Sequence, residues 1–270
     1  QASWSKWDLA ELPLPRLKEN LAQWQDGLAE AGWNSLYYDN HDQPRAVSRF
    51  GDDSPEHRVD SAKTLATVLH LHKGTPYIYQ GEEFGMTNAP LTQIEQYLDV
   101  ESLNYHSLAS AAGVPEEQIL RSLARKGRDN ARTPVQWDAT PYAGFTTGIP
   151  WMAVNPNYRQ INADEARRDP DSVFAHFQQL IRLRHSSEVV REGRFQLLLP
   201  DHEQLWAFTR TLGDEVLLVV ANCSSAPAEL PVGSLPDLDG AELILGTHPD
   251  AAATTLAPWE SRILRLSPPR

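Results

Sequence analysis

The chain has 270 residues, enough to bury a substantial core, and its 41% hydrophobic and 22% charged residues are typical of a globular rather than a disordered protein. A formal charge of -12 disfavours binding to the phosphates of nucleic acid or to anionic lipid. The single cysteine, Cys223, excludes an internal disulfide and a multi-cysteine metal site, and no apolar run reaches the ~20 residues of a membrane helix. We therefore expect a cytoplasmic protein whose partners include neither nucleic acid nor a membrane.

The first part of the chain alternates helical and strand patterns. Apolar residues at three- and four-residue spacing predict helices over 14–31 and 61–73, and aromatic-rich runs predict strands at 33–38 and 77–79. Polar residues follow each strand, in the order Asp39-Asn40-His41-Asp42 and Gln80-Gly81-Glu82-Glu83. A strand, helix, strand order with polar residues after each strand favours a parallel sheet or a (β/α) barrel, whose active site lies at the carboxyl ends of the strands.

The second part of the chain changes pattern twice. A long stretch rich in loop-forming residues extends to about residue 170, with helices predicted at 115–124 and, after it, at 172–185. Short strands separated by turn residues then predict an antiparallel β-sandwich, with strands at 205–210, 215–221, 241–245 and 262–266. We expect two domains, residues 1–190 and residues 191–270. A complete (β/α)8 barrel needs ~250 residues, so residues 1–190 are expected to form only the C-terminal part of one.

Two loops carry carboxylates that would converge at one rim if the preceding strands are parallel neighbours. Asp42 lies in the first loop, and Glu82 and Glu83 lie in the second. Converging carboxylates suit glycoside hydrolysis, which needs an acid, a nucleophile or base, and negative charge near an oxocarbenium-like centre. The alternative is that these carboxylates cap turns or pair with Arg45 and Arg49.

Several long blocks carry a resemblance to a known family. The first reads WNSLYY followed by NHDQPR and SRFGD, and it resembles the seventh-strand block of the α-amylase superfamily. Three others resemble the oligo-1,6-glucosidase group within that superfamily: GTPYIYQGEEFGMTN, GRDNARTPVQWD and the segment AGFTTGIPWMAVNPNY that ends at Tyr158. The chain is thereby identified as a member of the superfamily, and the resemblance implies a (β/α)8 TIM barrel followed by an antiparallel β-sandwich domain.

The resemblance implies roles for four residues. Asp42 matches the third catalytic carboxylate, which stabilises the cation-like transition state without forming the covalent bond. His41 matches an imidazole that contacts sugar hydroxyls, and Arg128 matches an arginine that lines the sugar pocket. Glu101 falls where similar glucosidases contact the leaving-group sugar. The alternatives are a structural role for His41 and a surface ion pair between Arg128 and Asp129.

The departures from the family pattern limit what the chain can do alone. The nucleophilic Asp and the acid/base Glu of the superfamily belong to upstream motifs, and neither motif is present. Glu82 and Glu83 match an eighth-strand loop that is not catalytic in similar enzymes. We therefore predict negligible hydrolysis by the isolated chain. No cofactor or metal is expected in this chain, and a Ca or Mg ion would belong to the missing N-terminal part.

The leading hypothesis is a retaining, exo-acting α-glucosidase that releases terminal α-linked glucose from short oligosaccharides or disaccharides. Its expected partners are the oligosaccharide substrate and the N-terminal part of the same enzyme. Trehalose-6-phosphate hydrolase and sucrose isomerase share much of the pattern and stay open as alternatives. A non-catalytic, glucosidase-like scaffold is the alternative from another class, and a natural split enzyme is a third hypothesis.

Overall fold

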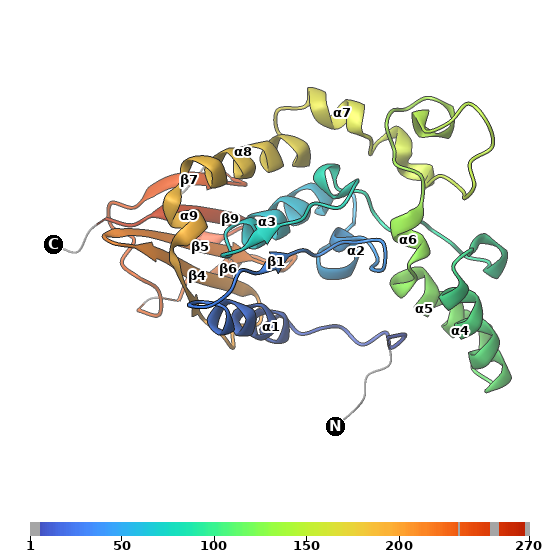
Figure 1. Cartoon of the computed structure of the whole chain (residues 1–270), viewed down its shortest axis with the longest axis horizontal. Coiled ribbons are helices and arrows are strands. Elements are labelled where there is room, and N and C mark those ends of the chain that lie inside the picture. The colour runs from blue at the N-terminus through green and yellow to red at the C-terminus, as the bar shows by residue number, and fades with distance from the viewer. Residues whose placement is uncertain (1–5, 232, 249–253, 268–270) are drawn as a thin grey trace. The chain divides into compact units, whose positions relative to one another are not determined.

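A computed structural model of the chain describes residues 6–231, 233–248 and 254–267 (Figure 1). It divides into two compact units that are discontinuous in sequence. The first unit comprises Gln1–Glu11, Tyr38–Phe50 and Ile78–Ala175. The second unit comprises Leu12–Tyr37, Gly51–Tyr77 and His176–Arg270.

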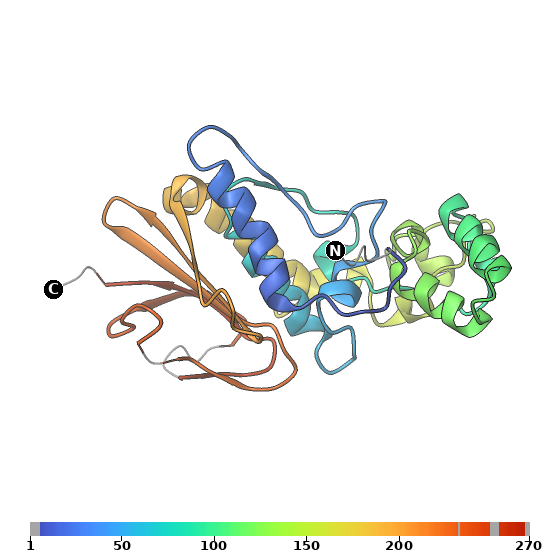
Figure 2. The same cartoon turned by 90° about the horizontal axis from the view of Figure 1, so that it is seen from below.

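The second unit is built around a five-stranded antiparallel sheet with the strand order β3-β4-β5-β9-β7. Helices α1, α3 and α9 pack against this sheet, and α1 is seen beside it in Figure 2. The bounds are α1 (Leu14–Gly27), α3 (Arg58–His70), α9 (Glu188–Glu192), β3 (Arg194–Leu198), β4 (Leu205–Leu212), β5 (Glu215–Asn222), β7 (Glu242–Gly246) and β9 (Ser261–Arg265).

A second, smaller antiparallel pair completes the C-terminal sheets. Strand β6 (Ala228–Glu229) pairs with β8 (Thr255–Leu256). The pair packs through Ala228 and Leu256 against Leu205, Ala207 and Val220 of the large sheet, and all five side chains are buried. Residues that favour strands explain why the two longest strands of this sheet form here: Trp, Phe and Thr in β4, and three Val in β5. The expected antiparallel C-terminal sheet is confirmed.

The two strands expected near the carboxylate loops are shorter than predicted. Strand β1 covers only Ser35–Leu36 and β2 only Thr75–Pro76, and they pair in parallel. Backbone hydrogen bonds of 2.8 Å from Thr75 to Asn34 and from Tyr77 to Leu36 fix the register. Among the described residues this sheet has two strands, and its ladder has two residue pairs. The strand predicted at 77–79 is wrong in position, because β2 begins two residues earlier, at Thr75.

Helix α1 forms where it was predicted, but a different face of it is buried. Trp24 is one of the apolar residues whose spacing predicted the helix, yet it is 56% exposed, whereas Lys18 and Gln25 are buried. The Lys18 ammonium donates to the carbonyls of Leu199, His202 and Leu205 at 2.6, 2.7 and 3.1 Å. Buried carbonyls need hydrogen-bond donors, and these three accept theirs from Lys18. Their need for a donor favours the orientation of α1 in which the Lys18 side points inward. Apolar periodicity could not reveal that requirement.

The first unit is largely helical and rich in loops. Helices α4 and α5 pack together, and Tyr97, Ile119 and Leu123 lie in their common core. The bounds in this part of the chain are α2 (Ala46–Phe50), η1 (Glu82–Phe84), η2 (Ile94–Gln96), α4 (Val100–Ala111), α5 (Glu116–Lys126), α6 (Asp129–Arg132), η3 (Pro141–Gly144), η4 (Pro156–Arg159), α7 (Ala163–Arg168) and α8 (Val173–Ser186), the last of which extends past Ala175 into the second unit.

Helix α4 was not predicted, and its sequence explains why. Val100 and Leu108 are 64% and 73% exposed, so its apolar residues do not follow one buried face. The helix is instead fixed at its start, where the Asp99 carboxylate caps it by accepting a 2.8 Å hydrogen bond from the Glu101 amide. Asp99 is therefore a structural residue of α4 before any functional role is considered.

Candidate active site

Asp42 lies in a polar turn shortly after β1 and before α2. The Asn40 side chain accepts a 2.7 Å hydrogen bond from the Asp42 amide, which closes an Asx turn and fixes the direction of the loop. The Asp42 side chain is 44% exposed, and His41 Nε2 lies 3.3 Å from its Oδ2. The expected neighbours His41 and Asp42 are thus adjacent and open to solvent.

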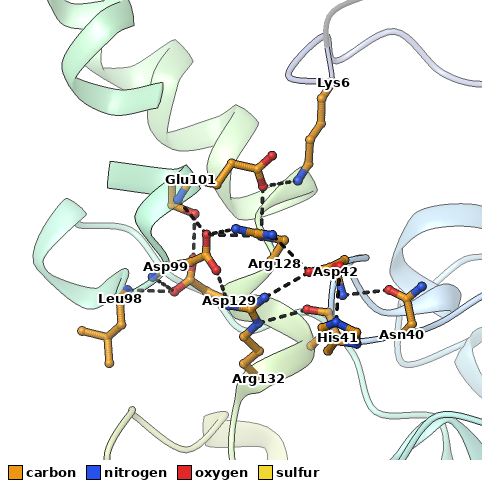
Figure 3. Close-up of polar contacts among 12 residues, drawn as sticks. Lys6, Asn40, His41, Asp42, Leu98, Asp99, Glu101, Arg128, Asp129 and Arg132 are labelled. Carbon is orange, nitrogen blue, oxygen red and sulfur yellow. Dashed lines mark hydrogen bonds and ion pairs between the residues drawn. The ribbon is translucent and has the colours of Figure 1, made fainter. Parts of the chain in front are cut away.

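Two arginines from α6 and its N-cap hold the Asp42 carboxylate (Figure 3). Arg128 Nη1 and Arg132 Nη2 each donate to Asp42 Oδ1 at 3.1 Å. Arg132 Nε also donates to the His41 carbonyl at 3.0 Å. Positions four residues apart lie on one face of a helix, so a single helical turn presents both guanidinium groups to one carboxylate oxygen.

A second carboxylate, Asp99, binds the same pair of arginines from the opposite side. Its side chain is 2% exposed, and it accepts from Arg128 Nη2 at 2.8 Å, from Arg128 Nε at 3.2 Å and from Arg132 Nη1. Burial disfavours the charged form of Asp99, but the hydrogen bonds from Arg128 and from the Glu101 amide, with the charge of Arg132, hold its pKa below the ordinary value. The hydrogen bond to Asp99 in turn raises the pKa of Arg128.

Glu101 lies in the same cluster but contacts protein groups. Arg128 Nε is 3.1 Å from Glu101 Oε2, and Lys6 pairs with the same oxygen. The carboxylate is about one-third exposed, at 36%. The structure therefore brings together Asp42, His41, Arg128 and Glu101, the four residues named from the sequence.

Asp129 serves as a hydrogen-bond acceptor at the start of α4, and this differs from the surface ion pair with Arg128 that the sequence left open. Its buried carboxylate accepts hydrogen bonds from the backbone amides of Leu98 and Asp99 at 2.7 and 2.9 Å and from the Ser102 hydroxyl at 2.7 Å. These bonds tie the start of α4 to α6. Arg128 meanwhile pairs with Asp42, as described above, so the expected alternative of an isolated Arg128–Asp129 surface pair does not describe the contacts.

The carboxylates of the second loop turn back onto their own backbone. Glu82 accepts from the Tyr79 amide at 3.1 Å, and Glu83 accepts from the Gly81 amide at 2.7 Å. Burial raises the pKa of both carboxyl groups, and the nearby Asp39 adds to the rise for Glu82. These two residues stabilise the loop after β2.

Histidines of α3 and its C-terminal end are buried among aromatic side chains of the second unit. His70 and His72 are 1% and 0% exposed, and burial lowers their pKa values to about 4 and about 3. Their Nδ1 atoms lie 2.9 and 2.7 Å from the carbonyls of Ala66 and Val68. Across the described ranges, no group of three or more His, Cys, Asp or Glu residues is arranged to hold a metal ion.

The chain matches two known protein families. Residues 1–193 match the family described as the catalytic domain of alpha amylase, and residues 195–263 match the C-terminal domain of maltogenic amylase. The chain belongs to the α-amylase family. Its fold class is accordingly the C-terminal portion of a TIM barrel followed by an antiparallel sheet domain.

Relatives in this family are glycosidases of similar local sequence but greater length. The oligo-1,6-glucosidase of Halalkalibacterium halodurans is 48% identical over 263 residues, covering 96% of this chain and 47% of the relative. The trehalose-6-phosphate hydrolase of Bacillus subtilis is also 48% identical, covering 98% of this chain and 48% of the relative. The chain spans about half the length of the curated relatives it matches.

Solved structures agree with this assignment. The crystal structure of trehalose-6-phosphate hydrolase from Bacillus licheniformis superimposes with a TM-score of 0.91 at 43% identity, covering 97% of this chain and 48% of that one. At 43% identity the similarity extends to the sequence as well as the fold. This α-amylase family chain therefore shares backbone geometry with enzymes of about twice its length.

Sequence reasoning missed two members of the arginine cluster, Asp99 and Arg132. Both are distant in sequence from Asp42, Arg132 by 90 residues. A signal for Arg132 was present, because it follows Arg128 by four residues in a segment compatible with one helical turn. A weaker signal for Asp99 was its place before a run with helix-forming residues, where aspartate is a preferred N-cap.

No helix among the described residues combines the length and the apolar character that crossing a bilayer requires.

Proposed function

We propose that this chain supplies the third catalytic carboxylate of a retaining, exo-acting α-glucosidase of the oligo-1,6-glucosidase type. The substrates are short oligosaccharides or disaccharides with a terminal α-linked glucose. One observation carries the proposal: Asp42 is open to solvent beside His41, while two guanidinium groups fix its carboxylate. Enzyme sites hold reacting groups in this way so that no reorganisation is needed at the moment of reaction.

In the proposed mechanism Asp42 stabilises positive charge on the sugar ring as the glycosidic bond breaks. A carboxylate that is positioned but not covalently bonded favours the oxocarbenium-like transition state over the neutral substrate. His41 and Arg128 contact sugar hydroxyls and orient the terminal glucose. Glu101 contacts the leaving-group sugar when the Lys6 contact opens. Arg132, like Arg128, holds the Oδ1 oxygen of Asp42.

The same mechanism requires a second polypeptide segment. Retaining hydrolysis uses two carboxyl groups about 5 to 5.5 Å apart, one as nucleophile and one as acid/base. We propose that both come from the N-terminal part of the enzyme, which is the protein partner of this chain. Support comes from the β1–β2 pair, whose neighbourhood exposes Trp33, Tyr37 and Tyr77 at 48%, 48% and 58%. Strand edges and aromatic side chains of this kind need covering.

Three further expectations complete the proposal. The domains are residues 1–190 and residues 191–270, and the location is cytoplasmic, in keeping with a single cysteine. A Ca or Mg ion, if the enzyme holds one, would bind in the N-terminal part, as the family resemblance implies. The net charge of -12 supports a neutral sugar rather than nucleic acid or an anionic membrane as the molecule bound.

The test is Asp42→Asn in the complete enzyme, made by joining or co-expressing this chain with its N-terminal part. We expect the kcat for isomaltose to fall by about 10²- to 10³-fold, the scale found for removing one preorganised stabilising group, with the folded state retained. The control is Asp214→Asn, an exposed residue in the turn between β4 and β5. Equal activity of the two variants would remove Asp42 from the catalytic role.

The isolated chain and other substrates separate the alternatives. Purified chain alone should give no measurable turnover of p-nitrophenyl α-glucoside, and robust turnover would contradict the assignment of roles. Preference of the complete enzyme for trehalose 6-phosphate, or conversion of sucrose to an isomer, would favour the hydrolase or isomerase alternative. An assembled protein that binds its N-terminal part but hydrolyses none of these would favour the scaffold alternative.

A further inference from the structure

Arg45 is a buried cation that the mechanism above does not use. It follows Asp42 by three residues and immediately precedes α2, and it is 0% exposed. Its backbone amide donates to the Asn88 side chain at 2.9 Å, which fixes the chain at this point. A fully buried guanidinium is rare unless its donors are occupied, so its contacts reveal its purpose.

Those contacts reach the turn that carries the two site arginines. Arg45 Nε donates to the Asn130 carbonyl at 3.2 Å, and Nη2 donates to the Ala131 carbonyl at 3.3 Å. Both carbonyls belong to α6, whose N-cap is Arg128 and whose last residue is Arg132. The Arg45 side chain, which comes from the Asp42 loop, thus binds the backbone between Arg128 and Arg132. These are the two arginines that contact Asp42.

A third hydrogen bond joins the loop after β2 to the same point. Arg45 Nη1 donates to the Gln80 carbonyl at 2.7 Å, and the Tyr79 hydroxyl donates to the Ala131 carbonyl at 3.0 Å. Gly81 allows this close approach, because an added Cβ would lie 3.1 Å from Arg45 Nη1. Three segments that are separate in sequence, 40–45, 79–81 and 130–131, therefore meet at one guanidinium.

Buried carboxyl groups around Arg45 keep a cation favourable there. Burial lowers the pKa of Arg45, whereas the charges of Asp39, Glu82 and Glu83 raise it. Burial in turn raises the pKa of Asp39 to about 6, against the opposing effect of Arg45. A neutral side chain at position 45 would remove the largest favourable charge acting on Asp39, so a substitution that tests the geometry alone must keep the positive charge.

We propose that Arg45 is a positioning residue that sets the distance between Asp42 and the arginines 128 and 132. The inference rests on the proposed function for its kinetic consequence, but its geometry stands on the contacts above. Helix α6 has four residues, too few for the helix to be rigid by itself. The Asn130 side chain anchors α6 to Ala124 and Gly127 at 2.9 and 3.1 Å. Arg45 joins the Asp42 loop to the backbone of α6, in addition to the side-chain links made by Arg128 and Arg132.

The test compares Arg45→Lys with Arg210→Lys in the complete enzyme. Lysine keeps the charge at position 45, but its compact ammonium cannot reproduce the fork that reaches three carbonyls. Arg210 is a matched control, because it is also 0% exposed and its guanidinium donates to the carbonyls of Leu71 and Gly193 in the second unit. Both variants lose hydrogen bonds from a buried guanidinium, but only one of them loosens α6.

For Arg45→Lys we expect kcat on p-nitrophenyl α-glucoside to fall by about 10- to 100-fold with KM within about threefold, since small displacements of positioned groups cost rate. Amide hydrogen exchange of the peptide covering 127–133 should quicken at least about tenfold. Arg210→Lys should leave both quantities near the wild-type values.

Two results would overturn the inference: a kcat loss no larger for Arg45→Lys than for Arg210→Lys, or unchanged exchange at 127–133 in Arg45→Lys. Failure of the proposed function has a different signature, because the wild-type complete enzyme would then hydrolyse no α-glucoside. In that case the exchange measurement alone decides whether Arg45 positions α6.

Discussion

Replacing Asp99 by asparagine would separate the two tasks that this buried carboxylate performs. Its oxygens accept from Arg128 at 2.8 and 3.2 Å, from Arg132, and from the Glu101 amide at the start of α4. Asparagine is as good an N-cap as aspartate, so the cap of α4 is retained. The substitution removes the charge, which is what binds the two guanidinium groups.

The magnitude follows from these contacts. A hydrogen bond to a charged partner contributes about 1.5 to 3 kcal/mol, and a pair broken on one side leaves the other charge without its partner. Arg128 and Arg132 retain Asp42, and they are partly exposed, at 24% and 29%, so the loss is less than the sum. We expect Asp99→Asn to destabilise the α4–α6 region by about 2 to 3 kcal/mol, and Asp99→Ala by about 1 kcal/mol more because the cap is lost as well.

Native-state hydrogen exchange is the appropriate assay, because a protein with more than one unit has no single unfolding free energy. Since 1.4 kcal/mol corresponds to a factor of ten, exchange in the peptides covering 99–111 and 127–133 should quicken about 30- to 150-fold in Asp99→Asn. Peptides of β4 and β5 should be unaffected.

Asp171→Asn is the matched control for this experiment. Asp171 is an exposed aspartate of the same unit, and a surface substitution of this kind changes stability by no more than about 0.5 kcal/mol. The reasoning is refuted if Asp99→Asn exchanges no faster than Asp171→Asn. It is also refuted if Asp99→Ala is no worse than Asp99→Asn, because the N-cap contribution would then be absent.

Two further predictions concern burial. Burial lowers the pKa of His72 to about 3 against about 6.5 unfolded, so the unfolded state binds the extra proton and stability falls as the pH drops from about 6.5 toward 3. His72→Gln should reduce that slope by about 1.4 kcal/mol per pH unit in the opening free energy of the second unit, measured by native-state hydrogen exchange of the β4 and β5 peptides between pH 6.5 and 4.5 and corrected for the pH dependence of intrinsic exchange. Gly81→Ala should lower the melting temperature more than Gly113→Ala: both glycines have positive φ, but an added Cβ meets Met86 Sδ at 2.3 Å at position 81 and nothing within 4 Å at position 113.

The sequence was informative where one segment determines its own structure. Helices α3, α5 and α8 follow from apolar spacing, and strands β4 and β5 follow from their β-branched and aromatic residues, so these elements appear within a few residues of their predicted positions. The site residues His41 and Asp42 also came from one contiguous motif. Neighbours in sequence share a turn, and the polar turn after a strand is a local property.

What the sequence concealed depends on contacts between distant segments. Lys18 of α1 is buried because three carbonyls some 180 residues later need its protons, at sequence separations of 181, 184 and 187. The lengths of β1 and β2 depend on which strands lie beside them, and a single chain's pattern does not contain that information. Asp99 is an acceptor for two arginines about thirty residues away, at separations of 29 and 33. No periodicity marks such a residue.

The hydrogen bonds of Asp42 also favour the proposed stabilising role over proton transfer. A general acid or base exchanges a proton with the substrate through a free oxygen, and a nucleophile must bring that oxygen to the anomeric carbon. Asp42 Oδ1 already accepts from Arg128 and Arg132, and Oδ2 faces His41 at 3.3 Å. Moving this carboxylate into bond-forming distance would break two charged hydrogen bonds, each contributing about 1.5 to 3 kcal/mol. A fixed negative charge that need not move is the role in which those bonds assist the reaction.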